Sequence, residues 1–381
     1  MSPHKLAEVL SLLLPVVPLD ARARAACVCR AWRAATSHPA LWEELDFEHC
    51  AVHVTNATLA SLCARAGDAL RTLRLELDAC THITSAGMLA ALHNGGCTGL
   101  RRLNGSAAGG PWLTAGMAQQ LVAACPLLNH TACAVHCCLS DAAALATVLP
   151  GPLKLTCSGN MWSMPPDVTQ LAECLRVNAT FTSLNLYGSR IGAACAAQLA
   201  ECLRVNTTLT SLGLGKNDIG EAGAMQLAEC LRVNTTLTSL DLDRNGISNA
   251  GATQLAECLH VNNTLTSLGL AANGIGAAGT TRLAECLRVN ATLASLILDF
   301  NVIGDTGTTQ LAECLRINTT LTHLSLNKNG IGAAGATQLA ECLRVNAALT
   351  SLDLIGNNFG TEGLEALRAA CPPQCTLLML S

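Results

Sequence analysis

Two patterns of apolar residues alternate along the second half of the chain. In the segment 209–236, Leu212 and Leu214 stand two residues apart, so a β-strand directs both side chains to one face. Asn217 follows at a turn, where its amide can satisfy backbone groups left unpaired at the strand end. The next apolar positions have the i, i+3, i+4, i+7 spacing of an amphipathic helix, and they are Ala224, Leu227, Ala228 and Leu231. The pattern predicts a strand, a turn, a helix and a return, with Asn234 ending the helix in the left-handed conformation.

This unit recurs at a fixed interval. The segment Leu-Ala-Glu-Cys-Leu occurs seven times, 28 residues apart, beginning at Leu171, Leu199, Leu227, Leu255, Leu283, Leu311 and Leu339. Such a period is typical of a solenoid, in which each unit buries its apolar face only against its neighbours. The pattern resembles the ribonuclease-inhibitor type of leucine-rich repeat, which is also found in NOD-like receptors. The resemblance implies an α/β horseshoe solenoid with a parallel sheet on the concave side and helices outside.

Weaker copies of the unit flank the regular ones. Strands are expected at 73–75 and 153–155, helices at 83–92 and 113–121, and a closing strand at 377–380. We therefore expect one array of about eleven units from residue 48 onward. Its repeats are degenerate over 48–170 and regular over 171–381. Glu173 and Arg176, with their equivalents, are expected to pair three residues apart within each helix.

Residues 1–47 are predicted to form a separate module of three short helices. Leu6, Val9, Leu10 and Leu13 follow helical spacing, and two prolines then break the chain. Asp20 is a suitable N-cap for a second helix that runs through Trp32. A third short element follows at 41–45. So small a module buries little surface alone, so contact with a partner or with the repeats is expected.

Three segments of this module resemble the F-box in order and spacing, namely Pro18-Leu19-Asp20, Val28-Cys29-Arg30-Ala31-Trp32 and Leu41-Trp42. The whole chain then has the layout of an F-box leucine-rich-repeat protein. In that family the F-box docks on an SKP-type adaptor, which links it to a cullin scaffold. The resemblance implies an adaptor contact made by Leu10, Leu13, Leu19, Val28 and Trp32. The alternative is that some of these residues, Trp32 above all, hold the three helices together.

The amino terminus also imitates a signal peptide. The apolar stretch 6–19 precedes the small-residue segment 21–23, but Glu8 and Asp20 interrupt the pattern. Asn-x-Ser/Thr triplets recur from Asn178 onward, and in a secreted protein they would be glycosylation acceptors. Because the asparagine that ends the helix precedes a threonine-containing return loop in each of these units, the repeat itself explains the triplets.

The chain contains 21 cysteines, an odd number, and seven of them recur once per helix. Neighbouring helices pack about 8–10 Å apart, whereas a disulfide needs Cα atoms within about 7 Å. Equivalent cysteines therefore cannot easily pair with one another. Unpaired, buried thiols indicate a reducing compartment, which predicts a cytoplasmic or nuclear protein.

Composition narrows the class of function. The 381 residues are 50% hydrophobic and only 2% aromatic, with a net charge of -4. This balance argues against nucleic-acid binding, which favours a basic stripe or an aromatic stacking surface. No apolar run approaches the roughly 20 residues of a membrane span.

The sequence offers no catalytic constellation. It has no Walker-type phosphate loop and no His-Glu-x-x-His motif, so neither an enzyme nor a cofactor is predicted. Histidine and cysteine gather in one place, at His130, Cys133, His136, Cys137 and Cys138. This cluster lacks a Cys-x-x-Cys pair, so no metal site is assigned.

The repeats differ from one another mainly at outward positions of the strand and turn. The middle outward position holds Asn185, Gly213, Asp241, Gly269, Ile297, Ser325 and Asp353 in successive units. The next outward position holds Tyr187, Gly215, Asp243, Ala271, Asp299, Asn327 and Ile355. The residue directly after it, called the third grid position, is Gly188, Lys216, Arg244, Ala272, Phe300, Lys328 or Gly356. The first is serine in six units and His323 in the other. Parallel strands lie about 4.8 Å apart, so these side chains tile the concave face as a grid.

Variation confined to this grid predicts a recognition surface. Tyr187, Phe300 and Arg244 are the candidate anchors, because aromatic residues and arginine dominate interface energetics. An acidic strip would favour a basic segment of a partner, and it comprises Asp241, Asp243 and Asp299. His323 and Lys328 complete the candidate set. The alternative is drift at exposed positions where packing imposes nothing.

The F-box resemblance implies a non-catalytic substrate-recognition subunit of an SCF-type ubiquitin ligase. The expected partners are an SKP-type adaptor, a cullin bound through it, and a protein substrate held by the repeats. The alternative is a leucine-rich-repeat sensor or inhibitor in which the first helices act only as an end cap.

Overall fold

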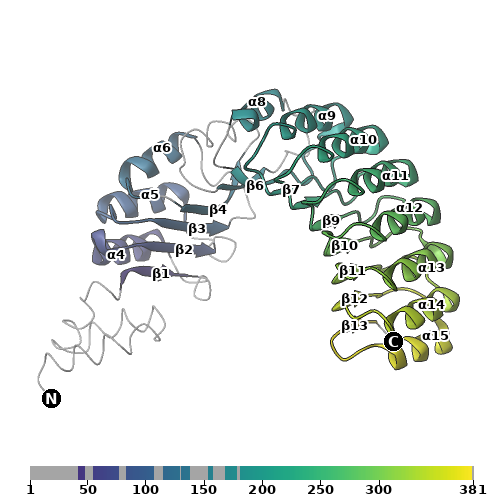
Figure 1. Cartoon of the computed structure of the whole chain (residues 1–381). Helices are drawn as coiled ribbons and strands as arrows, with labels where there is room; N and C mark the ends of the chain where they lie inside the picture. Colours follow the sequence, from purple (N-terminus) through teal and green to yellow (C-terminus); the bar gives the residue numbers. More distant parts are fainter. Residues whose placement is uncertain are drawn as a thin grey trace, which may run out of the picture. The chain divides into compact units, whose positions relative to one another are not determined.

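The structure, a computed structural model, describes residues 42–47, 55–76, 83–106, 115–128, 130–137, 153–157, 168–177 and 181–379 (Figure 1). The chain divides into two compact units. The first comprises residues 1–157 with 180–182, and the second comprises 158–179 with 183–381.

The first unit alternates helices with parallel strands that pair in chain order. Its elements are β1 (Glu44–Asp46), α4 (Asn56–Ala66), η4 (Gly67–Ala69), β2 (Thr72–Glu76), α5 (Ser85–Asn94), β3 (Arg102–Ser106), α6 (Ala115–Ala124), β4 (His130–Cys137) and β5 (Leu153–Cys157). Leu45, Leu73 and Leu103 are aligned across three strands and are fully buried. Side chains that alternate along each strand therefore place one leucine column in the core.

The second unit repeats the same arrangement with shorter strands. Its elements are α8 (Thr169–Val177), β6 (Phe181–Asn185), α9 (Gly192–Leu203), β7 (Ser211–Gly213), α10 (Gly220–Leu231), β8 (Ser239–Asp241), α11 (Ser248–Leu259), β9 (Ser267–Gly269), α12 (Ala277–Leu287), β10 (Ser295–Ile297), α13 (Gly304–Leu315), β11 (His323–Ser325), α14 (Ala333–Leu343), β12 (Ser351–Asp353), α15 (Gly360–Ala370) and β13 (Thr376–Leu378). In Figure 1 the strands line the inner side of this unit's arc and the helices its outer side. The predicted leucine-rich-repeat solenoid is confirmed.

The predicted apolar faces form the core of the second unit. Leu212 and Leu214 of one repeat are buried, as are Leu227 and Leu231 of its helix. Gly223 lets this helix approach the preceding one, because a Cβ there would lie 3.2 Å from the Ala196 Cβ. Stacked repeats thus share a continuous apolar interior.

Buried asparagines at the strand ends link each repeat to the next. The Asn217 amide donates to the carbonyls of Leu186 and Leu214, at 2.8 and 2.9 Å. The Asn245 Oδ1 in turn accepts from the backbone N–H groups of Asn217 and Ile219. The turn role predicted for Asn217 is confirmed, and the bonds extend to both neighbouring repeats.

A second row of buried asparagines follows the helices and corrects one expectation. Asn234 does not adopt the left-handed conformation. Its side chain is 4% exposed and donates to the Leu203 carbonyl at 2.7 Å, while its Oδ1 accepts from the N–H groups of Thr236 and Leu237. Asparagine is therefore required here for hydrogen bonding to the preceding repeat and to its own return loop. The same burial hides the side-chain nitrogen that a glycan would need.

Ion pairs correct a second expectation. Arg232 reaches Glu257 at 3.5 Å and Arg316 reaches Glu341 at 2.6 Å, so these pairs join neighbouring repeats. Three-residue spacing is seen for Arg204 with Glu201 and also for Arg282 with Glu285, a pair in which the arginine comes first. Among the described residues, the arginine that ends each helix thus bridges mainly to the next helix.

The cysteine ladder lies inside the second unit. Cys202, Cys230, Cys258, Cys286, Cys314 and Cys342 are buried, and all six are free thiols, as is the half-buried Cys174. Burial raises the pKa of the Cys230 and Cys286 thiols to about 12. These thiols therefore stay protonated and act as small apolar side chains.

The expected weak repeats are confirmed where the structure describes them. Strands β2 and β5 cover 73–75 and 153–155, helices α5 and α6 match the expected helices, and β13 overlaps the closing strand. The third short element expected at 41–45 is not a helix, since Glu44–Asp46 pairs with β2 as strand β1. From residue 48 onward the described residues hold twelve strands, β2 to β13, where about eleven units were expected, and β1 lies before them. The predicted limits 1–47, 48–170 and 171–381 stay predictions.

Candidate recognition surface

The candidate side chains lie where strands of the second unit end and turns begin. Leu240 and Leu242 point into the core, so the alternating Asp241 and Asp243 face outward. Strand β8 ends at Asp241, which places Asp243 in the following turn. The grid therefore consists of two outward residues on each strand, the first and the middle position, and two residues on each turn.

The third grid position adopts a left-handed backbone in all seven repeats. Glycine occupies it at Gly188 and Gly356, with φ of 68° and 75°. Five other residues adopt the same conformation, namely Lys216, Arg244, Ala272, Phe300 and Lys328. Left-handed backbone disfavours residues with a Cβ, and more so bulky ones. The turn thus imposes strain on Arg244 and Phe300 that glycine would avoid.

The carboxylates of Asp241 and Asp243 form a close pair. Asp241 Oδ1 accepts from the Asp243 N–H at 2.9 Å, and Asp243 Oδ1 accepts from the Ala271 N–H at 2.7 Å. A Cβ on Gly269 would lie 3.0 Å from Asp243 Oδ1 and 3.2 Å from Asp241 Oδ1. Both carboxylates therefore border the glycine of the next repeat.

The environment of Asp243 disfavours its charged form. Burial, together with the negative charges of Asp241 and Asp299, raises the pKa of Asp243 to about 6. The hydrogen bond from Ala271 and the charge of Arg244 only partly oppose this shift. A cation bound beside the pair would favour the charged form.

Asp299 belongs to the same acidic region, but its oxygens are used within the scaffold. Its Oδ1 accepts from the Ser325 hydroxyl at 2.6 Å and from the Asn327 N–H at 2.9 Å. Its Oδ2 accepts from the Asn327 amide at 3.3 Å. Sequence reasoning treated Asp299 as equivalent to Asp241 and Asp243, whereas the structure makes it mainly a link between repeats.

The two aromatic candidates, Tyr187 and Phe300, are exposed, and each contacts a different neighbouring residue. Tyr187 is 45% exposed, and its Cδ2 would lie 2.7 Å from a Cβ on Gly215. Asp241 Oδ2 would lie 3.4 Å from the same Cβ. The absence of a side chain at Gly215 therefore leaves the space between Tyr187 and Asp241 open, a role that sequence reasoning missed. The signal was available, because glycine holds two successive variable positions of that repeat, Gly213 and Gly215.

Phe300 and Lys328 form the other group. Phe300 is 51% exposed, and the Lys328 ammonium lies 4.7 Å from the centre of its ring. Such a contact is a cation–π interaction. His323 is exposed at the start of β11, with its Nδ1 2.8 Å from the Thr322 hydroxyl. The structure thus groups Tyr187 with Asp241 and Phe300 with Lys328, and places His323 with neither.

The remaining predicted residues lie outside the described part of the chain. Leu10, Leu13, Leu19, Val28 and Trp32 are all in this group. Within the described ranges, no group of three or more His, Cys, Asp or Glu side chains could hold a metal ion. In those same ranges, no helix is both long and apolar enough to cross a membrane.

Family comparisons define the class of protein. The family model described as "Leucine Rich repeat" matches residues 205–228, 233–256, 261–284, 289–312, 318–340 and 345–367, so the second unit is a leucine-rich-repeat array. The model described as "F-box-like" matches residues 6–48. The chain is an F-box leucine-rich-repeat protein.

Several solved structures resemble the chain at low identity. Leiomodin-1 actin-binding site 2 matches with 24% identity over 39% of this chain and 88% of that one, at a TM-score of 0.34. The leucine-rich-repeat protein LegL7 from Legionella pneumophila matches with 17% identity over 86% and 96%, at 0.43. A chain of the yeast Rad7–Elc1 complex matches with 17% identity over 85% and 88%, at 0.48. A search of curated proteins found no match.

Proposed function

We propose that this chain is the substrate-recognition subunit of an SCF-type ubiquitin ligase. Its F-box-like domain docks on an SKP-type adaptor and through it on a cullin, and its repeats bind a protein substrate. The observation that carries the proposal is the F-box-like domain standing before a leucine-rich-repeat array in one chain. Both are interaction modules rather than catalytic ones, so the subunit acts by holding a substrate near the ligase.

Capture of an SKP-type adaptor tests the first half of this proposal. The shortened chain should begin at Trp42, because Trp42, Leu45 and Phe47 are buried and β1 pairs with β2. A cut after residue 47 would remove a strand together with the F-box. We expect the full chain to retain the adaptor and residues 42–381 to lose it. If the full chain binds no SKP-type adaptor, the repeats serve instead as an uncoupled sensor or inhibitor.

A substrate with a basic segment is proposed for the concave side. The close Asp241–Asp243 pair supports this, because a positively charged side chain would relieve the repulsion between the two carboxylates. Tyr187 borders the same surface through Gly215 and adds an exposed aromatic face.

Charge reversal separates this surface from the rest of the chain. Asp241→Lys with Asp243→Lys should abolish substrate capture from a lysate while leaving adaptor capture intact. Glu362→Lys with Glu365→Lys changes the charge equally on the exposed side of α15 and should leave both unchanged. Equal substrate capture by both double variants would contradict a concave acidic site.

We also propose a cytoplasmic or nuclear location. The protonated, buried thiols and the buried asparagines of the Asn-x-Thr triplets support it. Expression in eukaryotic cells should yield a protein whose mass is unchanged by endoglycosidase treatment. A glycan on any triplet asparagine would contradict this location.

A further inference from the structure

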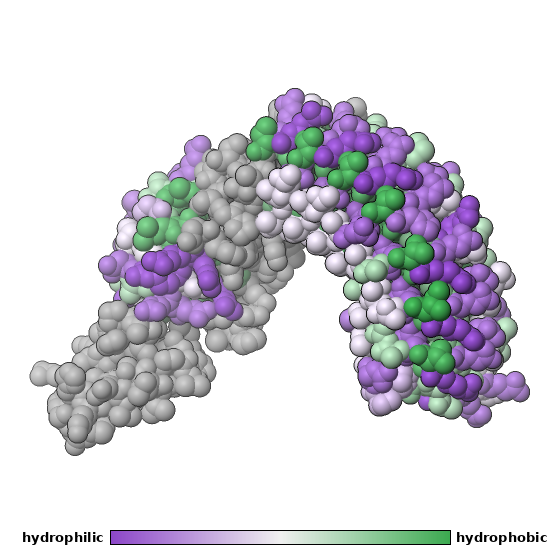
Figure 2. Space-filling view, in the orientation of Figure 1, coloured by the Kyte–Doolittle hydropathy of each residue, from purple (hydrophilic) through white to green (hydrophobic). Residues whose placement is uncertain are grey.

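A row of exposed aliphatic side chains runs along the second unit. One stands at or just after the end of each helix from α8 to α14, and together they form the valine ladder, which comprises Val177, Val205, Val233, Val261, Val289, Ile317 and Val345. Their exposed fractions lie between 53% and 85%. Figure 2 shows apolar surface as a green row that follows the repeats on the face turned toward the viewer.

Comparison of the repeats separates the ladder from drift at exposed positions. The position two residues after each ladder residue from Val205 onward is also exposed, and it holds Thr207, Thr235, Asn263, Ala291, Thr319 and Ala347. That position therefore alternates among three residue types over six repeats. The ladder itself changes once, to isoleucine at Ile317, which keeps the β-branched aliphatic character. Two exposed positions of the same loop thus differ in the range of residue types that they hold.

The ladder is large enough to act as an interface core. Isolated exposed valines are ordinary, but a row of seven exposes on the order of 500 Å² of apolar surface, the size at which a patch marks an interaction site. The residues on either side of each ladder residue are a charged or polar helix end and an asparagine, which is buried from Asn206 onward. The row is therefore apolar along its length and bordered by polar groups, as an interface core is.

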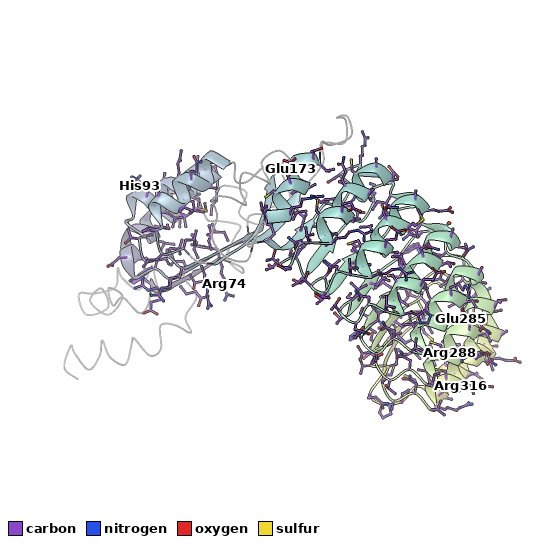
Figure 3. All side chains as sticks on the ribbon, turned by 45° about the horizontal axis from the view of Figure 1, so that its top comes forward. Arg74, His93, Glu173, Glu285, Arg288 and Arg316 are labelled. Atoms are coloured by element: carbon purple, nitrogen blue, oxygen red, sulfur yellow. The ribbon has the colours of Figure 1, made fainter. Side chains whose placement is uncertain are left out.

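Charges beside four of the seven ladder residues are already paired. The arginine immediately before a ladder residue reaches a glutamate of the next repeat, as Arg204 does with Glu229, Arg288 with Glu313 and Arg316 with Glu341. Figure 3 labels Arg288 and Arg316, which hold the same position in successive repeats. Where this arginine–glutamate pair forms, as also for Arg232 with Glu257, the border carries one positive and one negative group and no net charge, while His260 takes the place of the arginine before Val261. Such a border selects neither a basic nor an acidic partner, and it does not repel a copy of itself.

We propose that the valine ladder is the core of a symmetric interface between two copies of this chain. A half-turn about an axis that lies in the plane of the arc and passes through its middle superimposes the arc on itself with the chain direction reversed. The ladder of one copy then meets the ladder of the other with identical spacing, which gives a self-complementary two-fold contact. Two ladders together bury on the order of 1,000 Å² of apolar surface, and their polar borders bring the total into the roughly 1,200–2,000 Å² range of stable interfaces. The concave grid stays open in both copies.

Substitution at the middle of the ladder tests the proposal on the full chain. The test uses the register that pairs Val205 with Val345 and leaves Val177 outside the contact, so Val261 and Val289 flank the midpoint and face each other. Val261→Lys with Val289→Lys should raise the dimer dissociation constant by at least about 100-fold, since each change occurs twice in the interface. Asn263→Lys with Ala291→Lys places the same charges two residues away at exposed positions and should leave the dimer intact. Sedimentation equilibrium up to roughly 50 μM resolves a standard-size interface.

A mixing experiment guards against misfolding of the lysine variant. Val261→Asp with Val289→Asp should also be monomeric, whereas an equimolar mixture of the lysine and aspartate variants should form a heterodimer. A wild-type chain that stays monomeric overturns the proposal. So does a dimer that survives the valine substitutions, or a mixture that stays monomeric. A monomeric chain that captures a different protein through the ladder assigns the surface to that partner and overturns the self-association as well.

Discussion

The Lys328 ammonium lies 4.7 Å from the centre of the Phe300 ring, so two candidate recognition residues of neighbouring repeats contact each other. Both residues adopt left-handed backbone, with φ of 50° and 54°. The Lys328 stem also lies against Gly356, where a Cβ would come within 2.6 Å of the Lys328 Cγ. The left-handed turns at Phe300 and Lys328, together with the space at Gly356, therefore place the Lys328 ammonium over the exposed Phe300 ring.

Phe300→Gly should separate stability from recognition. Glycine occupies the same turn position at Gly188 and Gly356, and it relieves a left-handed strain of about 1 kcal/mol. We expect the free energy of unfolding of the variant to be equal to or above that of the wild type, while substrate capture falls. Urea unfolding and capture from a lysate measure the two effects. A destabilised variant would instead make Phe300 a structural residue.

Val302→Gly should give the strand-end residue Asn329 the hydrogen bonds that its equivalents in other repeats make. Within the described part of the chain, the Asn329 Oδ1 is buried without a hydrogen-bond partner. In other repeats this oxygen accepts two backbone N–H groups of the preceding turn, and the residue between them has positive φ, as at Gly246 and Gly274. Val302 does not adopt that conformation, because its β-branched side chain opposes it.

The expected gain follows from those two hydrogen bonds. Each contributes about 1 kcal/mol, and the entropy cost of a glycine removes roughly half of the total. Val302→Gly should therefore stabilise the chain by about 1 kcal/mol in urea unfolding, although it deletes a side chain that is 68% exposed. Val302→Ala keeps a Cβ and serves as the control, with no gain expected. A destabilised glycine variant would contradict the explanation.

Asp305→Ala should destabilise a helix of the following repeat. Asp305 Oδ1 accepts from the N–H groups of Gly332 and Gly335 at 2.7 and 2.9 Å, so it caps α14 from the preceding repeat. Helix α14 has no side-chain cap of its own at Gly332. Loss of the cap should cost about 1 kcal/mol in urea unfolding, whereas Asp305→Asn retains the acceptor and should cost less. Equal losses for both variants would indicate that the charge matters rather than the cap.

Sequence periodicity was sufficient to predict the repeats, because the core depends on the spacing of leucines and alanines alone. Leu212, Leu214 and Leu227 are buried as expected. The period also predicted Asn217 at the turn, but it did not predict the hydrogen bonds that this asparagine and its equivalents make with the preceding repeat. Those bonds depend on stacking geometry, so Asn234 and Asp305 revealed their partners in neighbouring repeats only in the structure.

The candidate surface was predicted in outline and corrected in detail. The exposed Tyr187 and the half-buried Asp241 lie near each other because Gly215 leaves space between them. Asp299 has the same residue type and the same grid position as Asp243, yet it bonds to Ser325 and Asn327. Residue type shows which chemistry a position can offer, whereas the neighbouring repeat decides whether that chemistry is free for a partner.

Asp243→Asn should stabilise the chain at neutral pH and not at acidic pH. The pKa of Asp243 in the folded chain is raised to about 6, above its ordinary value of 3.8. Between these values the folded state binds more protons than the unfolded state, so this group lowers the free energy of unfolding as pH rises. The full shift corresponds to roughly 3 kcal/mol, and solvent screening of a partly exposed carboxyl reduces it to about 1 kcal/mol.

Paired urea titrations at about pH 4 and pH 7.5 measure this contribution as the difference between wild type and variant. The amide introduced by Asp243→Asn keeps an oxygen that can accept from the Ala271 N–H, so the hydrogen bond is retained while the charge is removed. The difference should be about 1 kcal/mol at the higher pH and close to zero at the lower one, since protonation removes the wild-type charge there. Asp353→Asn removes a strand carboxylate outside the Asp241–Asp243 pair and should give a smaller difference. A variant equally stable with the wild type at both pH values would show that the Asp241 and Asp243 charges do not repel strongly enough to favour a cationic partner.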